Sequence, residues 1–202
     1  MARFIWKDVK TTYREERASK HGSELRWLVN DETIEDTETG KTFKRAAIRH
    51  PGICVIVPFI SKDQIVLMRQ YRFAADEDLW ELPAGTVNGK EEGNRMVQTE
   101  SPEACAAREL LEETGYEAGR VRKIAECFAM PGTSDEIIYV FFATELTERS
   151  QSLEETEIIS EIRPFTSGEL AGMISRNEIR DAKTLVGLFY ALSRKPHGLQ
   201  IS

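Results

Sequence analysis

Short runs of β-branched and aliphatic residues recur from residue 52 onward and are separated by polar turns. Two of them, "GICVIVPFI" (52–60) and "QIVLMRQY" (64–71), are joined by "SKD", an arrangement typical of a β-hairpin. Further runs predict four later strands, at 79–85, 121–130, 136–146 and 158–165. We therefore expect most of the sheet to come from the part of the chain after Pro51-Gly52.

The first 50 residues follow a different pattern, because they are polar and mix both signs of charge. Strand-like pieces occur at 24–29 and 41–49, and the turn-rich stretch "NDETIEDTETG" (30–40) lies between them. This segment is too poor in apolar residues to form a core of its own. We therefore predict an N-terminal strand-rich segment (1–50), which adds strands to a neighbour or to a partner subunit, and a main domain (51–202).

One helix is strongly signalled over residues 102–114. Ser101 is a favourable N-cap, and Pro102 then takes the first helical position. Gly115 ends the segment, as glycine commonly does after the last turn of a helix. The sequence therefore predicts both boundaries of this helix as well as its existence.

Two more helices are predicted near the C-terminus. The segment 166–177 opens with Thr166 and Glu169 in capping-box spacing. The segment 181–195 has an amphipathic pattern. The apolar residues that share one face of it are Ala182, Leu185, Val186, Phe189 and Leu192. Strands interspersed with a few helices predict an α/β fold, in which helices cover both sides of a sheet.

Length and composition suit one domain, or one domain with an extra lobe. The 202 residues are 41% hydrophobic and 30% charged, which is enough apolar material for a real core. The N-terminus, "MARFIWKDVK", lacks the apolar core of a signal peptide. No apolar run approaches the roughly 18 residues of a membrane span. We therefore expect a soluble, cytoplasmic protein without a membrane partner.

The charge balance argues against one broad class of function. With 27 Lys and Arg against 34 Asp and Glu, the net charge is −7, whereas a general nucleic-acid coat needs a basic face. A small anionic ligand held by local arginines and a metal stays compatible. The cysteines Cys54, Cys105 and Cys127 show neither zinc-site nor disulfide spacing, and they predict free thiols in a reducing compartment.

The stretch "RELLEETGYE" (108–117) gathers like charges on one helix face. Glu109, Glu112 and Glu113 are surface neighbours in the last turn of the predicted helix, and each like-charged pair costs roughly 0.2–0.5 kcal/mol. The helix dipole adds about 0.3–1 kcal/mol for each anion. Both costs are small, so a solvated acidic face explains the pattern as well as a bound cation does. Carboxylates are the ligands that Mg²⁺ or Mn²⁺ prefers, and a divalent ion would relieve the repulsion.

The segment 84–116 resembles the Nudix box, whose pattern is G-x5-E-x7-R-E-U-x-E-E-x-G-U, with U a bulky apolar residue. The second half matches at every fixed position, which here are Glu100, Arg108, Glu109, Leu110, Glu112, Glu113, Gly115 and Tyr116. The first half departs, because 14 residues separate Gly85 from Glu100 where the family has five. Glu91 stands at the family's distance from Gly85, so the nine extra residues fit the pattern equally well before or after Glu91. We expect the extra residues to form a long, solvated excursion before the helix.

Sequence on both sides of the box is similar to the ADP-ribose pyrophosphatase branch of the Nudix superfamily. The similar stretches are 49–58, 69–85, 131–136 and 181–192. The resemblance implies a Nudix fold, which is a mixed β-sheet sandwiched between α-helices, and a homodimer that the N-terminal segment helps to form. It also implies metal-dependent hydrolysis of the pyrophosphate bond of ADP-ribose or a related nucleoside diphosphate sugar. The products would be a nucleoside monophosphate and a sugar phosphate.

The resemblance assigns metal-binding roles to residues of the box. Glu109 and Glu113 are the expected ligands of Mg²⁺ (or Mn²⁺), and Glu112 contributes directly or through water. The main-chain carbonyl of Ala84 is expected to coordinate as well. Arg108 is expected to pair with a carboxylate and so to fix the helix.

The catalytic base of this branch comes from a mobile acidic loop after the box. In this sequence the loop offers Glu157 as the first choice, followed by Glu154 and Glu155. An ordinary solvated acidic loop would have the same composition, so this assignment depends on the resemblance.

Four further residues are expected to contact the substrate. Arg72 resembles a phosphate-contacting residue, which suits the bidentate geometry of guanidinium. Glu136 is expected to hold a substrate hydroxyl or to support a metal. Phe43 and Arg45 are candidates to stack on, or hydrogen-bond, a nucleotide base that is bound to the other subunit.

Two other functions stay open at this point. The same chemistry could act on another substrate, such as GDP-mannose, a UDP-sugar, a dinucleoside polyphosphate or a capped RNA 5′ end, although the acidic balance weighs against RNA. A noncatalytic nucleotide-binding or regulatory module is the alternative from a different class. Such a module would typically have lost the helix carboxylates, which this sequence keeps.

Overall fold

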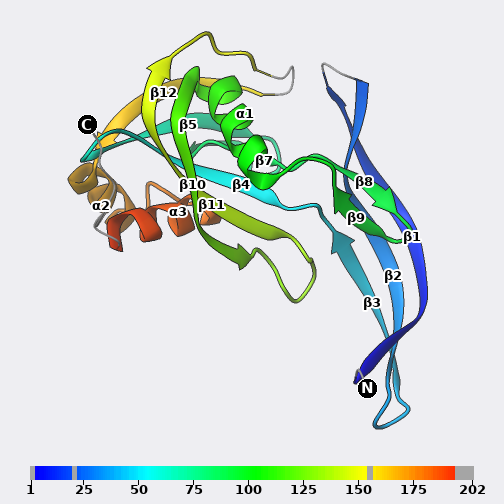
Figure 1. Cartoon of the computed structure of the whole chain (residues 1–202). Helices are drawn as coiled ribbons and strands as arrows, with labels where there is room; N and C mark the ends of the chain where they lie inside the picture. The colour runs from blue at the N-terminus through cyan, green and yellow to red at the C-terminus, as the bar shows by residue number, and fades with distance from the viewer. Residues whose placement is uncertain (1–2, 20–21, 154–156, 194–202) are drawn as a thin grey trace. The chain divides into compact units, whose positions relative to one another are not determined.

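The computed structural model describes residues 3–19, 22–153 and 157–193 (Figure 1). The chain divides into two compact units. The first unit consists of Met1–Gly52, Thr86–Glu100 and Phe128–Ile137. The second consists of Ile53–Gly85, Ser101–Cys127 and Ile138–Ser202.

The first unit is built on a three-stranded antiparallel sheet with the order β1-β2-β3. Its strands are β1 (Phe4–Ser19), β2 (Gly22–Asp36) and β3 (Thr42–Arg49). The sequence pattern missed β1 and assigned the end of β2 to a turn, because these stretches are mainly polar. They are held by ladder pairing and by cross-strand side-chain pairs instead of a core. One such pair joins Trp6 Nε1 to Glu32 Oε2 at 2.8 Å.

The residues between Gly85 and Glu100 form a separate hairpin of the first unit. It consists of β8 (Gly89–Glu92) and β9 (Arg95–Gln98), and it packs against β2. The side chain of Asn30, fully buried on β2, donates to the main-chain oxygen of Asn94 at 2.8 Å. The hairpin residues stay exposed or half-exposed, as expected for a solvated segment, but strand pairing and the bond from Asn30 give the segment an ordered structure.

His50 follows β3 and is half-buried within the first unit. Its Nδ1 accepts a hydrogen bond from the Gly52 N–H at 3.0 Å, and its own N–H donates to Asp135 Oδ1 at 2.9 Å. Burial lowers the pKa of His50 to about 4. The charge of Asp135 opposes this shift and that of Arg26 adds to it.

We expect His50 to make the folded state less stable as the pH falls from about 6.5 to about 4. Above this window the imidazole is neutral in both states and contributes nothing to the pH dependence. Within it the unfolded chain takes up a proton that the folded protein excludes, so the free energy of unfolding falls. The full shift corresponds to about 3 kcal/mol.

Denaturant titrations of the wild type and of His50→Asn at pH 7.5, 5.5 and 4.5 measure this effect. Asparagine retains an acceptor for the Gly52 N–H but cannot titrate. The difference in stability between the two proteins should change with pH in favour of the variant under acid conditions. Parallel pH curves would contradict the assignment.

The second unit contains the large sheet, in which the strand order is β10-β11-β4-β5-β12. These strands are β4 (Ile53–Ser61), β5 (Gln64–Arg72), β10 (Tyr116–Phe128), β11 (Ile137–Glu148) and β12 (Ile159–Thr166). Two short strands complete it, β6 (Glu77–Glu81) beside β5 and β7 (Ala84–Thr86) beside β4. The β4–β11 pair is parallel and the β5–β12 pair antiparallel, so the sheet is mixed.

Helices cover both faces of this sheet at β4 (Figure 1). The helices are α1 (Pro102–Thr114), α2 (Ser167–Ser175) and α3 (Ala182–Ser193). Cys54 contacts the main chain of Pro102 at the start of α1, whereas Val55 and Val57 lie beside Gly187 of α3. Alternate residues of a strand point to opposite faces, so α1 and α3 lie on opposite sides. The predicted α/β fold with a sandwiched mixed sheet is confirmed.

Helix α3 buries a different face from the one that its apolar pattern suggests. Its buried residues are Thr184, Gly187, Leu188 and Ala191, whereas Phe189 is 65% exposed. The apolar pattern does not predict this face, because two of its residues are not apolar side chains. Thr184 contacts Leu82 through its hydroxyl, and Gly187 allows the helix to come close to Leu82.

Candidate active site

Helix α1 begins and ends where its capping residues predict. The side chain of Ser101 accepts a hydrogen bond from the Ala104 N–H at 3.1 Å, and Pro102 takes the first turn. At the other end Gly115 adopts the left-handed conformation, with φ +73°, and its N–H donates to Leu111 O. These caps fix which residues occupy the last turn, and thereby place the glutamates of the box.

Three carboxylates from two segments of the chain meet beside α1. Glu109 and Glu113 are one turn apart and are 6% and 2% exposed. Glu157 reaches the same place from the segment before β12, and one oxygen from each of the three lies within 4.8 Å of the others. The fold therefore brings together the two residues expected to bind the metal, Glu109 and Glu113, and the residue expected first as the base, Glu157. The other candidates for the base, Glu154 and Glu155, lie outside the described residues.

The electrostatics of this glutamate cluster (Glu109, Glu113 and Glu157) favour a cation. Burial raises the pKa of Glu109 to about 7, and the neighbouring Arg108 opposes the shift. Burial also raises the pKa of Glu113 well above its usual range, and the charges of Glu109 and Glu157 raise it further. Burying several carboxylates at one point is costly unless positive charge compensates them. Buried oxygen ligands of this kind fit a hard divalent ion.

The turn between β6 and β7 presses its backbone against these glutamates. The Ala84 N–H donates to Glu113 Oε2 at 2.8 Å, so the main chain of Ala84 lies beside one carboxylate. A Cβ atom on Gly85 would stand 2.0 Å from Cδ of Glu109. Glycine is therefore required here by the close approach of Glu109, which explains the first glycine of the box.

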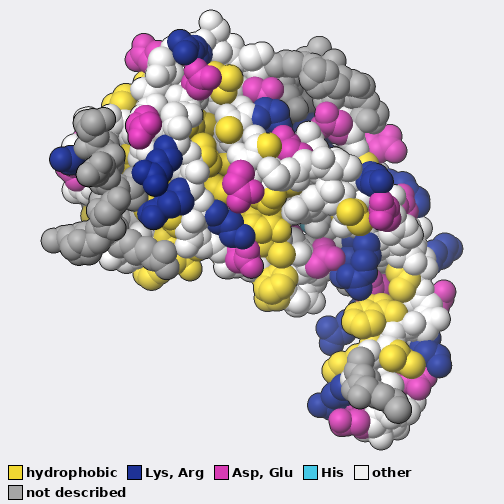
Figure 2. All heavy atoms as spheres, in the orientation of Figure 1, with side chains coloured by type: hydrophobic (Ala, Val, Ile, Leu, Met, Phe, Trp, Pro, Cys, Tyr) yellow, Lys and Arg dark blue, Asp and Glu magenta, His cyan; other side chains and the backbone are white. Residues whose placement is uncertain are grey.

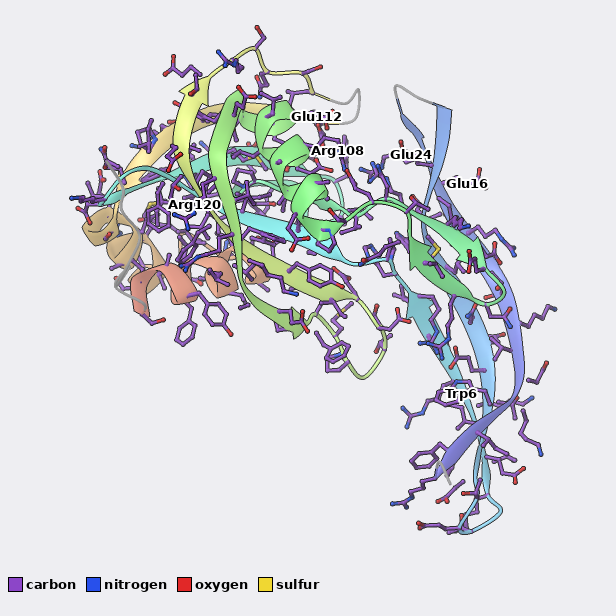
Figure 3. All side chains as sticks on the ribbon, in the orientation of Figure 1. Trp6, Glu16, Glu24, Arg108, Glu112 and Arg120 are labelled. Atoms are coloured by element: carbon purple, nitrogen blue, oxygen red, sulfur yellow. The ribbon has the colours of Figure 1, made fainter. Side chains whose placement is uncertain are left out.

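Arg108 and Glu112 extend from α1 and are paired with each other (Figure 3). The guanidinium of Arg108 lies 3.0 Å from Glu112 Oε2 and 2.7 Å from Glu109 Oε1. Arg108 thus contacts a carboxylate of the cluster, in the manner expected of a residue that fixes the helix. Glu112 is not among the three clustered carboxylates, and its predicted metal role would need a water molecule or a movement.

The segment 149–152, which follows β11, is bonded to the end of α1. The Arg149 N–H donates to Gly115 O at 2.6 Å, and the Ser152 N–H donates to Glu112 O at 3.0 Å. The side chain of Gln151 donates to the main-chain oxygen of Glu113. The segment 149–152 in this way supplies hydrogen-bond donors to carbonyl groups at the C-terminal end of α1.

Gly115→Ala should destabilise the fold by about 2 kcal/mol, because a left-handed φ costs a non-glycine residue roughly 1 kcal/mol and a steric clash adds to this cost. The added Cβ would lie 2.9 Å from the Arg149 main-chain oxygen. Gly93→Ala is the matched control: its φ is +61°, but no described atom lies within 4 Å of its Cβ position. Urea titrations should show the larger loss for Gly115→Ala, and equal losses would contradict the clash.

Arg72 is held by a residue that the sequence analysis did not single out. Glu81, at the end of β6, is fully buried and accepts from Arg72 Nε at 2.8 Å and Nη2 at 2.6 Å. Lys183 at the start of α3 also donates to Glu81. The sequence does contain a signal for this pair, which is a glutamate inside the apolar run "LWELPAG". A charged residue in such a run indicates a buried carboxylate, and a buried carboxylate needs a cationic partner.

The remaining predicted substrate residues belong to the first unit. Phe43, which is 43% exposed, and Arg45 lie on β3. The main chain of Glu136 pairs with Ala129 and with the Ser134 hydroxyl in the 130–136 loop. Their roles in substrate binding stay predictions.

The comparisons with known proteins agree with this geometry. The family model of the NUDIX domain matches residues 48–186. The chain belongs to the Nudix family. Nudix hydrolases generally need a divalent metal, and the glutamate cluster of this chain is suited to hold one.

Relatives of this Nudix chain include proteins named as pyrophosphatases. An ADP-ribose pyrophosphatase of Bacillus subtilis (strain 168) is 34% identical over 166 residues, which are 80% of this chain and 84% of the relative. A GDP-mannose pyrophosphatase of Shigella flexneri is 31% identical over 174 residues, with 81% and 84% covered. The crystal structure of an ADP compounds hydrolase matches with a TM-score of 0.68 at 19% identity, covering 94% of this chain and 92% of that one. This likeness supports the fold.

Within the described ranges, the helices of this Nudix chain are all too short or too polar to cross a membrane.

Proposed function

We propose that this Nudix protein hydrolyses the pyrophosphate bond of ADP-ribose or a related nucleoside diphosphate sugar. The products are a nucleoside monophosphate and a sugar phosphate. The observation that carries the proposal is the convergence of Glu109, Glu113 and Glu157 within 4.8 Å beside the box helix. The relatives that act on ADP-ribose and on GDP-mannose support this class of substrate.

The metal-binding residues of the proposed reaction are Glu109, Glu113 and the Ala84 carbonyl, with Glu112 acting through water. A bound Mg²⁺ or Mn²⁺ would neutralise charge on the diphosphate oxygens and polarise the phosphorus. The chain supplies the buried carboxylates, and Gly85 supplies the room that Glu109 needs. Arg108 holds the Glu109 carboxylate in place through its ion pair.

Glu157 is our candidate for the base that orients water and takes its proton. Its carboxylate is half-buried beside those of Glu109 and Glu113, and a general base must lie within hydrogen-bond reach of the water whose proton it takes. Arg72 is oriented by its bidentate pair with Glu81, and the remaining edge of its guanidinium suits a phosphate oxygen. Glu136 is proposed to hold a substrate hydroxyl.

A panel of substrates tests the proposal. ADP-ribose, GDP-mannose, UDP-glucose, a dinucleoside tetraphosphate and a capped RNA are each incubated with Mg²⁺ and with Mn²⁺, and nucleoside monophosphate is measured by chromatography. We expect metal-dependent release of AMP from ADP-ribose or of GMP from GDP-mannose. Binding of these compounds without turnover in either metal would support a noncatalytic nucleotide-binding module instead.

We further propose that the protein is a homodimer formed through its N-terminal sheet. Hydrophobic side chains reach the surface of the first unit (Figure 2), and exposed ones include Phe4, Ile5, Trp6, Tyr13 and Phe43. Apolar groups gathered on an open sheet commonly mark an interface. Phe43 and Arg45 would then contact the base of a nucleotide bound to the other subunit. The cytoplasm stays the expected compartment, because the three cysteines are free thiols.

A further inference from the structure

The turn from Glu81 to Gly85 is held by its backbone from three directions. The Ala84 N–H donates to Glu113 Oε2 at 2.8 Å, and the Pro83 carbonyl accepts from the Ile56 N–H at 2.9 Å. The Leu82 N–H donates to Oγ1 of Thr184 at 2.9 Å, across 102 residues of sequence. One of these three supports is therefore a side chain of helix α3.

Thr184 is fully buried, and so is Leu82. Valine would fill the same volume and has a similar helix propensity, so neither packing nor helix formation calls for threonine here. The hydroxyl is therefore explained by its acceptor oxygen, without which the buried Leu82 N–H would lose its partner.

A second contact brings α3 close to the same turn. A Cβ atom on Gly187 would stand 2.5 Å from Cδ1 of Leu82, so only glycine lets the helix approach this far. Thr184 and Gly187 are nearly one turn apart and lie on one face of α3. Together they fix both the main chain and the side chain of Leu82.

We propose that Thr184 is a positioning residue of the metal site. Its hydroxyl fixes the Leu82 amide, and two residues later the same turn presents the main chain of Ala84 beside Glu113. This inference rests on the proposed function, in which Ala84 and Glu113 hold the metal. It gives a role to the start of α3, which is remote in sequence from the Nudix box.

The test compares Thr184→Val, which keeps the shape but loses the acceptor, with Thr184→Ser, which keeps the hydroxyl. Affinity for Mn²⁺ is measured by isothermal titration calorimetry on the intact protein, without substrate. We expect Thr184→Val to bind Mn²⁺ about tenfold more weakly, as is usual when a residue that supports a metal ligand is lost. Thr184→Ser should stay within about twofold of the wild type. Thr144→Val, in the buried part of β11, is the matched control and should leave the affinity unchanged.

Unchanged Mn²⁺ affinity in Thr184→Val would overturn the inference, and so would equal losses in the valine and serine variants. Should Thr184→Val not fold, Thr184→Ala decides, since it also removes the acceptor of the Leu82 N–H; wild-type Mn²⁺ affinity there would overturn the inference. A wild-type protein that binds no Mn²⁺ would overturn both this inference and the metal part of the proposed function. Normal Mn²⁺ binding without hydrolysis would overturn the proposed activity alone.

Discussion

Replacing Glu113 by glutamine is expected to lower kcat roughly a thousandfold, or about 4 kcal/mol of activation free energy, without destabilising the fold. Glutamine has the same shape and keeps an acceptor for the Ala84 N–H, so the turn should not move. What is lost is the negative charge, and with it one of the proposed ligands of the divalent ion. This variant therefore separates the electrostatic role of Glu113 from its structural role.

The stability of Glu113→Gln should equal or exceed that of the wild type when both are measured in EDTA. Burial and the neighbouring carboxylates raise the pKa of Glu113, so a charged carboxylate is unfavourable there without a metal. A neutral amide removes that cost. Residues of functional sites often lower the stability of the fold in this way, and replacing them then raises it. Thermal denaturation and steady-state kinetics measure the two quantities. Glu103→Gln, an exposed change on the same helix, is the control. A marked fall in Tm, or unchanged turnover, would contradict the assignment.

Gly85→Ala should reduce kcat roughly 10²- to 10³-fold, because it displaces the proposed metal ligand Glu109 without replacing any carboxylate. The new methyl group would lie 2.0 Å from Cδ and 2.1 Å from Oε1 of Glu109, where no real contact can exist. Since the turn is bonded on three sides, we expect Glu109 to swing away from the glutamate cluster rather than the backbone to yield.

Gly168→Ala is the matched control for this variant. Gly168 also has an ordinary φ, and no described atom lies within 4 Å of its Cβ position. This change in α2 should therefore leave kcat within about twofold of the wild type, as ordinary surface substitutions do. Full activity of Gly85→Ala would show that Glu109 is not needed in its observed position.

The parts of the site that the sequence predicted are those governed by local spacing. Helical neighbour spacing alone brings Glu109 and Glu113 together, and the caps at Ser101 and Gly115 are local features. Glu157 joins them across 44 residues, so only the family resemblance pointed to it. The close approach of Gly85 to Glu109 likewise depends on how a turn meets a helix, which spacing does not encode.

The features that the sequence did not predict depend on polar partners far along the chain. Strand β1 is mainly polar, so its pattern lacks the alternation that marks a half-buried strand. The buried Glu81 is explained only by Arg72 and Lys183, which come from two other elements. The buried face of α3 was missed for the same reason, because Thr184 is there to bond the Leu82 amide.

The β8–β9 hairpin changes the spacing of the Nudix box, and this affects whether a motif search detects the chain. Its strands place Gly89 opposite Gln98, and the Thr99 N–H bonds to Asn88 O at 2.8 Å, so the extra residues leave and return at one point. A loop that closes on itself in this way can vary in length at small entropic cost. A search with a regular expression of fixed spacing would pass over this chain. A search that allows a variable gap before Glu100 would retrieve it, together with any homologue that has a longer or shorter hairpin here.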